Sequence, residues 1–301
     1  MAQKLLKGAQ TGLQYAKIGN PGDEHLAAFL DACKNNDIAL AERLASRRDA
    51  GTLTFGLNEA LKGNHLDLAS RMLSKGATWD AFTIKYASAS FEAVKLLVES
   101  GYDVNTGMPA GAVLLPLVLQ RNDEACIRYL LAHGADPRLG PPLIARNPLI
   151  NARPEPNSYW TLNMAAAFCS TETFALLLSH GADAKGAIAL HYAASHGYAL
   201  PDLSGVPGIS RVPMLEYLVN DLGFDVNGMD DMIEITSGGR ACDGTPLSYA
   251  VRGGCVEEAQ WLLAHGADPD IKSNFGISAR MHAQRLPRDH ELVALLGGGG
   301  E

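Results

Sequence analysis

The stretch Leu262-Leu263-Ala264-His265-Gly266-Ala267-Asp268 decides the fold, because variants of it recur along the chain. Each copy has two apolar residues, two variable residues and a glycine, and most copies continue with a small residue and an aspartate. Four further copies follow the pattern closely and a looser one carries an inserted residue; they begin at Met72, Leu97, Leu130, Leu177 and, for the looser copy, Leu218. This recurrence predicts an array of similar units.

Each copy ends a helical pattern, in which apolar residues such as Leu66, Ala69 and Met72 recur at spacings of three and four. The glycine suits a left-handed residue just past the helix end, where a Cβ atom would clash. A shorter helix is expected upstream of these longer ones, at residues 57–62, 114–120, 161–168, 190–195 and 246–252. The unit is therefore a short helix, a tight turn, a longer helix and a Gly-Ala-Asp turn into an extended loop.

Two further stretches resemble the ankyrin repeat family. Residues 243–250, Asp-Gly-Thr-Pro-Leu-Ser-Tyr-Ala, resemble the family's opening Thr-Pro-Leu-His-x-Ala, with Ser248 in place of the histidine. Residues 190–197 are similar to the second half of that opening, and the two Asp-Val-Asn segments resemble the family's lead into the next β-turn. The resemblance implies an all-α ankyrin-repeat solenoid of about eight helix-turn-helix units, with short β-turn fingers.

Three insertions lengthen the family's period of about 33 residues. The Pro-rich segment 138–157 and the acidic segment 228–242 fall between units on the finger side, whereas segment 197–213 splits the two helices of one unit. Insertions in repeat arrays form loops, so two long loops are expected on one side of the array.

The expected domain organisation has three parts. The N-terminal extension, 1–23, is expected to fray, and the tail 297–301 is rich in glycine and expected to be flexible. The ankyrin repeat domain spans 24–296; its first unit, 26–45, is degenerate, and its last, 277–296, carries arginines that suit the polar outer face of a terminal repeat.

Composition narrows the class of protein. A net charge of −8 argues against a nucleic-acid binder driven by overall electrostatics, and no apolar run reaches the ~20 residues of a membrane span. The N-terminus lacks the pattern of a secretory signal. Five cysteines, an odd number without a CxxC pair, favour a reducing compartment. We expect a cytoplasmic monomer, with the nucleus as an alternative location, that binds neither nucleic acid nor membrane.

Catalytic motifs are absent from the sequence, and we predict no catalytic residue, no metal ligand and no cofactor. His191 is expected to form structural hydrogen bonds, and a triad of Ser195, His191 and Asp202 lacks a nucleophile elbow. Three more histidines precede turn glycines without a carboxylate or cysteine to complete a tetrahedral metal set, and are expected to be solvated helix-end residues: His133, His180 and His265.

By the resemblance, ligands meet the ends of the short inner helices and the tips of the β-turns. Lys62, Arg121 and Arg252 fall at such helix ends and predict a basic line that attracts an acidic or extended segment of another protein. Aromatic residues anchor interfaces, which adds candidates at or near turn tips, and two more lie at inner-helix ends: Trp79, Phe82, Tyr102, Tyr159 and Trp160, then Phe168 and His196.

Two classes of function remain open. The first is a protein–protein interaction module, acting as a scaffold, an adaptor or an inhibitory subunit that covers another protein's site. The alternative is an enzyme or small-molecule binder with a pocket under the 138–157 and 228–242 loops. Its residues would be Arg153 and Asp231, together with Tyr159, Trp160 and His196.

Overall fold

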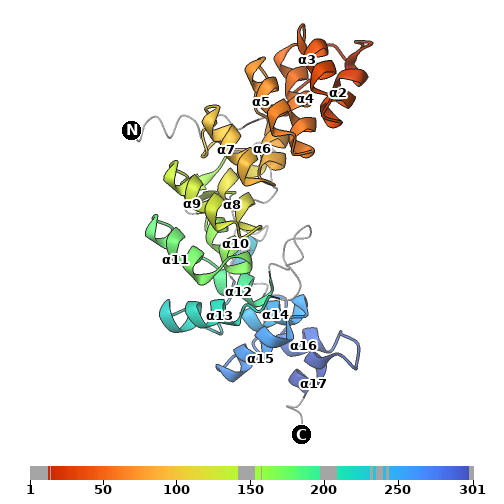
Figure 1. Cartoon of the computed structure of the whole chain (residues 1–301). Coiled ribbons are helices and arrows are strands. Elements are labelled where there is room, and N and C mark those ends of the chain that lie inside the picture. The colour runs from red at the N-terminus through yellow and green to blue at the C-terminus, as the bar shows by residue number, and fades with distance from the viewer. Residues whose placement is uncertain are drawn as a thin grey trace. The chain divides into compact units, whose positions relative to one another are not determined.

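The computed structural model describes residues 13, 15–141, 153–156, 158–196, 209–230, 233–234, 240–241 and 244–297. In chain order its helices form successive pairs (Figure 1). The pairs are α2 (Leu26–Lys34) with α3 (Ile38–Ala45), α4 (Ala50–Lys62) with α5 (Leu66–Ser74), α6 (Ala81–Ala87) with α7 (Phe91–Glu99), α8 (Leu114–Leu119) with α9 (Glu124–Ala132), α10 (Trp160–Phe168) with α11 (Thr171–Ser179), α12 (Ala189–Ala194) with α13 (Val212–Glu216), α14 (Pro246–Gly253) with α15 (Val256–Ala264), and α16 (Ala279–Ala283) with α17 (Glu291–Gly297).

We call the first helix of each pair inner and the second outer. The described residues fall into two compact units. Unit 1 takes those within Met1–Val118, Asp123–Ala135 and Leu149–Pro154, and unit 2 takes the rest. In unit 1 the inner helices α2, α4 and α6 contact one another in succession, as do the outer helices α3, α5, α7 and α9. In unit 2 the inner helices α10, α12, α14 and α16 form such a row, and α15 contacts the outer helices α13 and α17.

The apolar pair of the repeated phrase forms the core of each outer helix. Its first residue is completely buried in every copy: Met72, Leu97, Leu130, Leu177, Leu218 and Leu262. The second residue is half-buried in all copies but one, Leu131, which is buried. The helical spacing predicted from sequence is therefore confirmed at the position that matters most for burial.

The turn glycines adopt the predicted left-handed conformation. Their φ angles are 100, 98, 86, 96, 73 and 91°, and no atom lies within 4 Å of where a Cβ would stand, at Gly76, Gly101, Gly134, Gly181, Gly223 and Gly266. The glycines are therefore required by backbone conformation and not by crowding. The N–H of the next residue closes the turn, as in Ala267 to the carbonyl of Leu262 at 2.9 Å.

The looser copy of the phrase absorbs its inserted residue as a π-helical turn. Residues Tyr217–Asp221 form the π-helix η2 directly after α13, and the N–H of Phe224 reaches the carbonyl of Leu218 at 2.9 Å. This bond spans one residue more than its counterparts. A π-bulge is the usual way for a helix to accommodate a single insertion while keeping its apolar side in register.

One inner helix is longer than the sequence predicted. Helix α4 begins at Ala50, not at residue 57, because the side chain of Asp49 accepts a hydrogen bond from the N–H of Thr52 and caps an additional first turn. Gly51 and Gly56 hid this turn from the sequence analysis, since glycine is a poor helix former. Gly51 also has a steric role, because the carbonyl oxygen of Lys17 approaches it closely.

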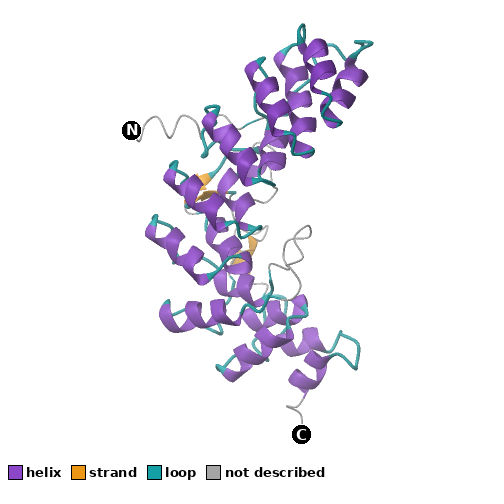
Figure 2. Ribbon diagram, in the orientation of Figure 1, coloured by secondary structure: helices purple, strands orange, loops and turns teal. Residues whose placement is uncertain are grey.

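Short antiparallel ladders stand at the bases of two insertions (Figure 2). Strand β1 (Leu139–Gly140) pairs with β2 (Glu155–Pro156), and β3 (Ile233–Glu234) pairs with β4 (Arg240–Ala241). Much of the insertions lies outside the described residues: 142–152, 157, 197–208, 231–232, 235–239 and 242–243. The predicted pocket beneath the two loops therefore stays a prediction.

The chain ends differ from one another. Of the extension expected to fray, 1–23, the structure describes residues 13 and 15–23, and several of these are hydrogen-bonded to unit 1. Gly297 ends helix α17, and 298–301 lie outside the described residues. No helix in the described part of the chain is long and apolar enough to span a membrane.

Candidate functional site

The turns that follow the outer helices are fixed by side-chain hydrogen bonds. In five of them an aspartate carboxylate accepts the N–H of the residue two positions on, at 2.8–3.0 Å: Asp103, Asp136, Asp183, Asp225 and Asp268. The asparagine of each Asp-Val-Asn segment also donates to the carbonyl of the following turn glycine, Asn105 to Gly134 and Asn227 to Gly266. Hydrogen bonds therefore fix these turns internally, and they also connect two of the turns to the turn glycine of the following repeat.

Three lysines lie on successive inner helices of unit 1. Lys34, Lys62 and Lys85 stand in the last turns of α2, α4 and α6, and all three are exposed. We call them the lysine row. Lys62 was predicted from sequence, and its Nζ lies 5.9 Å from the ring centroid of Tyr86. Cations also suit helix C-termini through the dipole, so the exposure of these lysines on contacting helices matters more here than their number.

The other two predicted basic residues belong to unit 2. Arg121 is exposed just after α8, whereas Arg252 is half-buried with its guanidinium 5.4 Å from the ring centroid of Tyr249. The expected basic line therefore divides between the two units, with Lys62 in unit 1, where it lies between two further exposed lysines on contacting helices, and Arg121 and Arg252 in unit 2.

Two predicted turn-tip aromatics in unit 1 are packed against each other. Tyr102 is only 4% exposed, and its ring meets that of Trp79 edge-on at 5.8 Å. Burial raises the pKa of the Tyr102 hydroxyl, and neither that hydroxyl nor the indole N–H of Trp79 has a hydrogen-bond partner among the described residues. Tyr102 is therefore a core residue in this structure. A turn next to a stacked neighbour offers more burial than its sequence position suggested.

Sequence reasoning selected Phe82 but neither Tyr15 nor Tyr86, and these three rings lie at least partly exposed in unit 1. Phe82, in the first turn of α6, is 41% exposed; its ring is 4.9 Å from that of Tyr15 and 6.1 Å from that of Tyr86. Tyr15 is 49% exposed. We call Tyr15, Phe82 and Tyr86 the aromatic row. Because Lys62 lies over Tyr86, the aromatic row and the lysine row are continuous.

One end of the aromatic row is Tyr15, which belongs to the chain segment that precedes α2. The N–H of Leu13 donates to the carbonyl of Gly107 at 2.6 Å, and the N–H of Ala16 donates to Asp80 Oδ2 at 2.9 Å. We call residues 13 and 15–19 the N-terminal strap. The strap crosses the first turns of α6 and α4 and the loop before α8, which is a part of the finger side.

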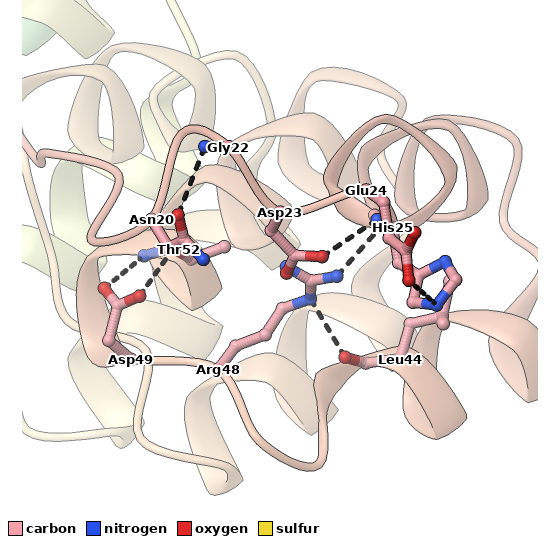
Figure 3. A network of polar contacts seen from close by, with 9 residues as sticks. All are labelled: Asn20, Gly22, Asp23, Glu24, His25, Leu44, Arg48, Asp49 and Thr52. Atoms are coloured by element: carbon pink, nitrogen blue, oxygen red, sulfur yellow. Dashed lines mark hydrogen bonds and ion pairs between the residues drawn. The ribbon is translucent and has the colours of Figure 1, made fainter.

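Figure 3 shows how the chain between the strap and α2 is fixed. Arg48 donates from Nη1 to Asp23 Oδ2 at 2.6 Å, from Nη2 to the carbonyl of His25 and from Nε to that of Leu44. Its side chain is buried, with the guanidinium 4.6 Å from the ring centroid of Phe29. The N–H of His25 and the Arg48 charge lower the pKa of Asp23. Arg48 thus links α3 to the end of the extension.

In unit 2, one predicted aromatic lines a small open hollow. Tyr159, half-buried and left-handed at φ 55°, borders about 200 Å³ of space. The other lining residues are Pro137, Arg138, Leu162, Ala182 and Asp183. Arg138 is already paired with Asp136 at 2.8 Å, so the hollow presents no free cluster of titratable groups.

The other described residues of the alternative pocket do not line this hollow. Trp160 meets Tyr192 edge-on at 6.2 Å, His196 bonds Glu258, and Arg153 is exposed. Asp231 lies outside the described residues. Phe168, predicted as a partner contact, is half-buried at the end of α10.

A buried carboxylate that the sequence analysis did not select organises part of unit 2. Glu258, 2% exposed, accepts hydrogen bonds on Oε1 from the N–H of Arg211 and from His196 Nε2, both at 2.8 Å. Burial alone would raise the pKa of Glu258, but these two donors outweigh it and lower the pKa. Arg211, itself buried, donates to the last carbonyls of α10, at Ala166 and Cys169. It caps that helix from a segment more than 40 residues away.

Cys255 completes a cluster with His196 and Glu258 whose donor atoms all lie within 4.8 Å of one another. Burial raises the pKa of the Cys255 thiol to about 12, so the thiol is protonated at neutral pH. The short His196–Glu258 bond already uses one donor atom from each of these side chains. The cluster is therefore accounted for as a hydrogen-bonded core group.

Residues 162–273 match the family model described as ankyrin repeats, in three copies. This segment of the chain carries ankyrin repeats. The crystal structure of the human ASB11 ankyrin repeat domain is similar at 19% sequence identity, with 91% of this chain and 99% of that chain covered and a TM-score of 0.44. No curated protein matches the sequence. Ankyrin repeats are generally protein–protein interaction modules.

Within the ankyrin repeats, His191 has the structural role that its motif position predicted. It is buried, and its Nε2 donates to the carbonyls of Gly228 and Gly244 at 3.1 and 3.2 Å. Burial lowers the pKa of His191 to about 4, so the ring is neutral at physiological pH. The Ser195 hydroxyl donates to the carbonyl of His191, which shows that the two side chains do not form a nucleophile–base pair.

The three histidines before turn glycines act as helix C-caps. In each, Nδ1 donates to the carbonyl four residues earlier, at 2.7–2.9 Å: His133 to Tyr129, His180 to Leu176 and His265 to Trp261. Two of the rings also stack on those aromatic residues, at centroid distances of 4.0 and 3.7 Å. The predicted helix-end role is confirmed, with a hydrogen bond to the helix in addition.

Proposed function

We propose that this protein is an interaction module without catalysis of its own, which binds an acidic, extended segment of another protein along the lysine row of unit 1. The observation that supports this most directly is that Lys34, Lys62 and Lys85 lie exposed in the last turns of contacting inner helices, next to exposed aromatic rings. A concentrated positive strip on a chain of net charge −8 steers an acidic segment to one place.

The spacing of the lysine row suggests the pattern of the partner. Neighbouring packed helices lie about 8–10 Å apart, and an extended chain rises about 3.3 Å per residue. Acidic side chains about three positions apart would therefore face successive lysines. Exposed Phe82 and half-buried Tyr86 would pack against apolar residues between them, since aromatic residues supply much of the energy of interfaces.

A scaffold, an adaptor or an inhibitory subunit would all use such a strip, and they differ only in the partner. The four free cysteines among the described residues are all buried, which suits a module that works in a reducing compartment such as the cytoplasm.

The experiment is a binding comparison between two triple variants of equal charge. Acidic 12-residue peptides are screened on an array, and the best binder is titrated by fluorescence polarisation. The test variant carries Lys34→Glu, Lys62→Glu and Lys85→Glu. The control carries Arg43→Glu on the outer helix α3, Lys75→Glu at the C-cap of α5 and Lys95→Glu on α7.

We expect at least a tenfold loss of affinity in the test variant and less than a threefold change in the control, at equal thermal stability. An equal loss in both would mean that the peptide senses only net charge, and no loss in either would place the binding surface elsewhere. Either result would overturn the proposal.

A further inference from the structure

The N-terminal strap is seated on unit 1 by steric fit as well as by hydrogen bonds. A Cβ at Gly51, in the first turn of α4, would collide with the carbonyl oxygen of Lys17, and a Cβ at Gly19 would lie 2.5 Å from Asp49 Oδ2. The strap and the helix therefore each have a glycine where the other comes closest. Gly51 costs α4 helix propensity, so close approach of a second backbone explains its presence.

The surface of unit 1 on which the strap lies is called the seat here. It also contains a buried hydrogen-bond acceptor for the strap, the Asp80 carboxylate. Asp80 is 2% exposed, and its Oδ1 accepts from the N–H and hydroxyl of Thr83 and from the side-chain amide of Asn58. Its Oδ2 accepts from the backbone N–H of Ala16. A buried carboxylate oxygen needs a donor, so this contact selects for a backbone N–H at one point of whatever chain lies there.

An aromatic side chain marks the residue beside that N–H. Tyr15 lies against Phe82 at 4.9 Å, yet both rings keep more than two fifths of their surface exposed. Elsewhere in the strap Leu13 and Ile18 are half-buried, whereas the side chain of Lys17 is exposed and its carbonyl meets α4. The seat thus recognises an aromatic ring and an extended backbone, with flanking apolar residues that are only partly covered.

We infer that this seat is a peptide-docking site, which the chain's own strap occupies in cis. Its ligand in trans is an extended segment with an aromatic residue followed by a residue that has a free backbone N–H, the chemistry of Tyr15 and Ala16. The inference deepens the proposed function, on which it rests, because the aromatic row connects this seat to the lysine row. A partner segment that binds along the lysine row as far as Lys62 and continues along the aromatic row would contact the strap.

Occupation in cis makes the strap a competitor for that partner. A segment tethered by a short linker has an effective concentration of about a millimolar, so an isolated peptide of the same sequence binds weakly while the strap is in place. Displacement needs either a tighter segment or a partner that gains affinity from the lysine row at the same time.

The test uses the full chain and a fluorescein-labelled peptide with the sequence of residues 11–20. Tyr15→Ala with Ala16→Pro removes the ring and the donated N–H and should release the strap while leaving the seat intact. Gly51→Ala, added to this pair, places a methyl group in the seat on a residue that tolerates alanine in a helix. Lys17→Ala alone is the control, because the side chain it removes is exposed.

The expected result is at least tenfold tighter peptide binding to the released variant than to the wild type, with the Lys17→Ala chain equal to the wild type. Adding Gly51→Ala should remove the gain without lowering the melting temperature. Hydrogen exchange of the segment containing residues 15–19 should rise in the released variant, which verifies release independently.

Two results would overturn the inference. One is a released variant with fast-exchanging strap amides that binds the peptide no better than the wild type. The other is a gain that persists when Gly51→Ala is present, since the peptide would then bind elsewhere. Neither result bears on the lysine-row variants, whose own comparison decides the proposed function.

Discussion

Units 1 and 2 are built from the same helix pair and the same glycine turn, but they bury different polar groups. In unit 1, Asp80 is the one acidic, basic or histidine residue that is buried as a whole among the described residues, and it lies where the strap crosses α6. In the described part of unit 2, four are buried: His191, Arg211, Asp230 and Glu258. The repeated leucines supply a common core, whereas the buried polar groups give each unit its own connections.

The difference has a physical consequence for each unit. The buried groups of unit 2 tie together segments that are far apart in sequence, and each loses its hydration on folding. Unit 1 instead places its individual features at the surface, where the strap and the two rows of side chains meet solvent. We therefore expect unit 2 to be the more sensitive to pH and to the loss of a single polar partner.

The largest effect is expected at the buried apolar position that recurs in the outer helices of both units. Leu177→Asp buries an unpaired charge at a position of zero exposure and should destabilise the chain by about 4 kcal/mol or more. The neighbouring Leu178 is only half-buried, so Leu178→Asp is the matched control and should cost roughly half as much or less. Urea denaturation followed by circular dichroism measures both. Equal losses would mean that the register of the outer helix is wrong.

Next in size is the network particular to unit 2. Arg211→Met keeps much of the side-chain volume but leaves the carbonyls of Ala166 and Cys169 without their donor and removes a buried charge next to Glu258. We expect a loss of about 3 kcal/mol in the same assay. Arg211→Lys should recover part of it. A loss below about 0.5 kcal/mol would show that water replaces the guanidinium at no cost and would weaken the contrast between the units.

What recurs in the sequence could be predicted, and what occurs once could not. The outer-helix leucines, the turn glycines and the helix-end histidines were all accessible because each appears at several copies of one phrase, so its position in the fold follows from its neighbours. The same reasoning extends to Asn36, Asn64 and Asn122, which are left-handed in the turns between paired helices. Asparagine accepts that conformation more readily than most residues.

The single-copy features depend on partners that no local pattern reveals. The Arg211 guanidinium meets carbonyls 42 and 45 residues away, and Glu258 replaces an apolar residue on a helix face that the spacing assigned to the core. The strap was interpreted as part of a frayed end because it is terminal and precedes the first repeat unit, and nothing in the pattern indicated that Gly19 and Gly51 mark a close crossing of two backbones. Position on a turn was likewise a poor guide to exposure for Tyr102.

A pH titration tests whether unit 2 carries the sensitivity. The pKa of His191 is about 4 in the folded chain against an ordinary value of 6.5, so between these values the unfolded chain binds a proton that the folded chain does not. Its contribution is fully present above about pH 6.5 and is lost as the pH falls toward 4, to a total of about 3 kcal/mol.

The matched variant is His191→Gln, whose side-chain amide supplies a donor near the position of Nε2 without titrating in this range. Urea denaturation at pH 7.5 and pH 4.5 should show a smaller loss on acidification for the variant than for the wild type, by about 2–3 kcal/mol. A difference indistinguishable from zero would mean that other groups carry the acid sensitivity.

The smallest predicted effect is the cost of replacing a turn glycine, which we expect to be the same in both units. Gly101 in unit 1 and Gly181 in unit 2 have φ angles of 98 and 96°, with no atom near the position of a Cβ. Gly101→Ala and Gly181→Ala should each cost about 1 kcal/mol, through backbone strain alone. Gly297→Ala is the control, since that glycine has open space and no positive φ, and it should be neutral. Unequal costs at Gly101 and Gly181 would show that the surroundings relieve the backbone strain in one unit. The glycine turn would then be one of the features that distinguish the two units, and not a feature that they have in common.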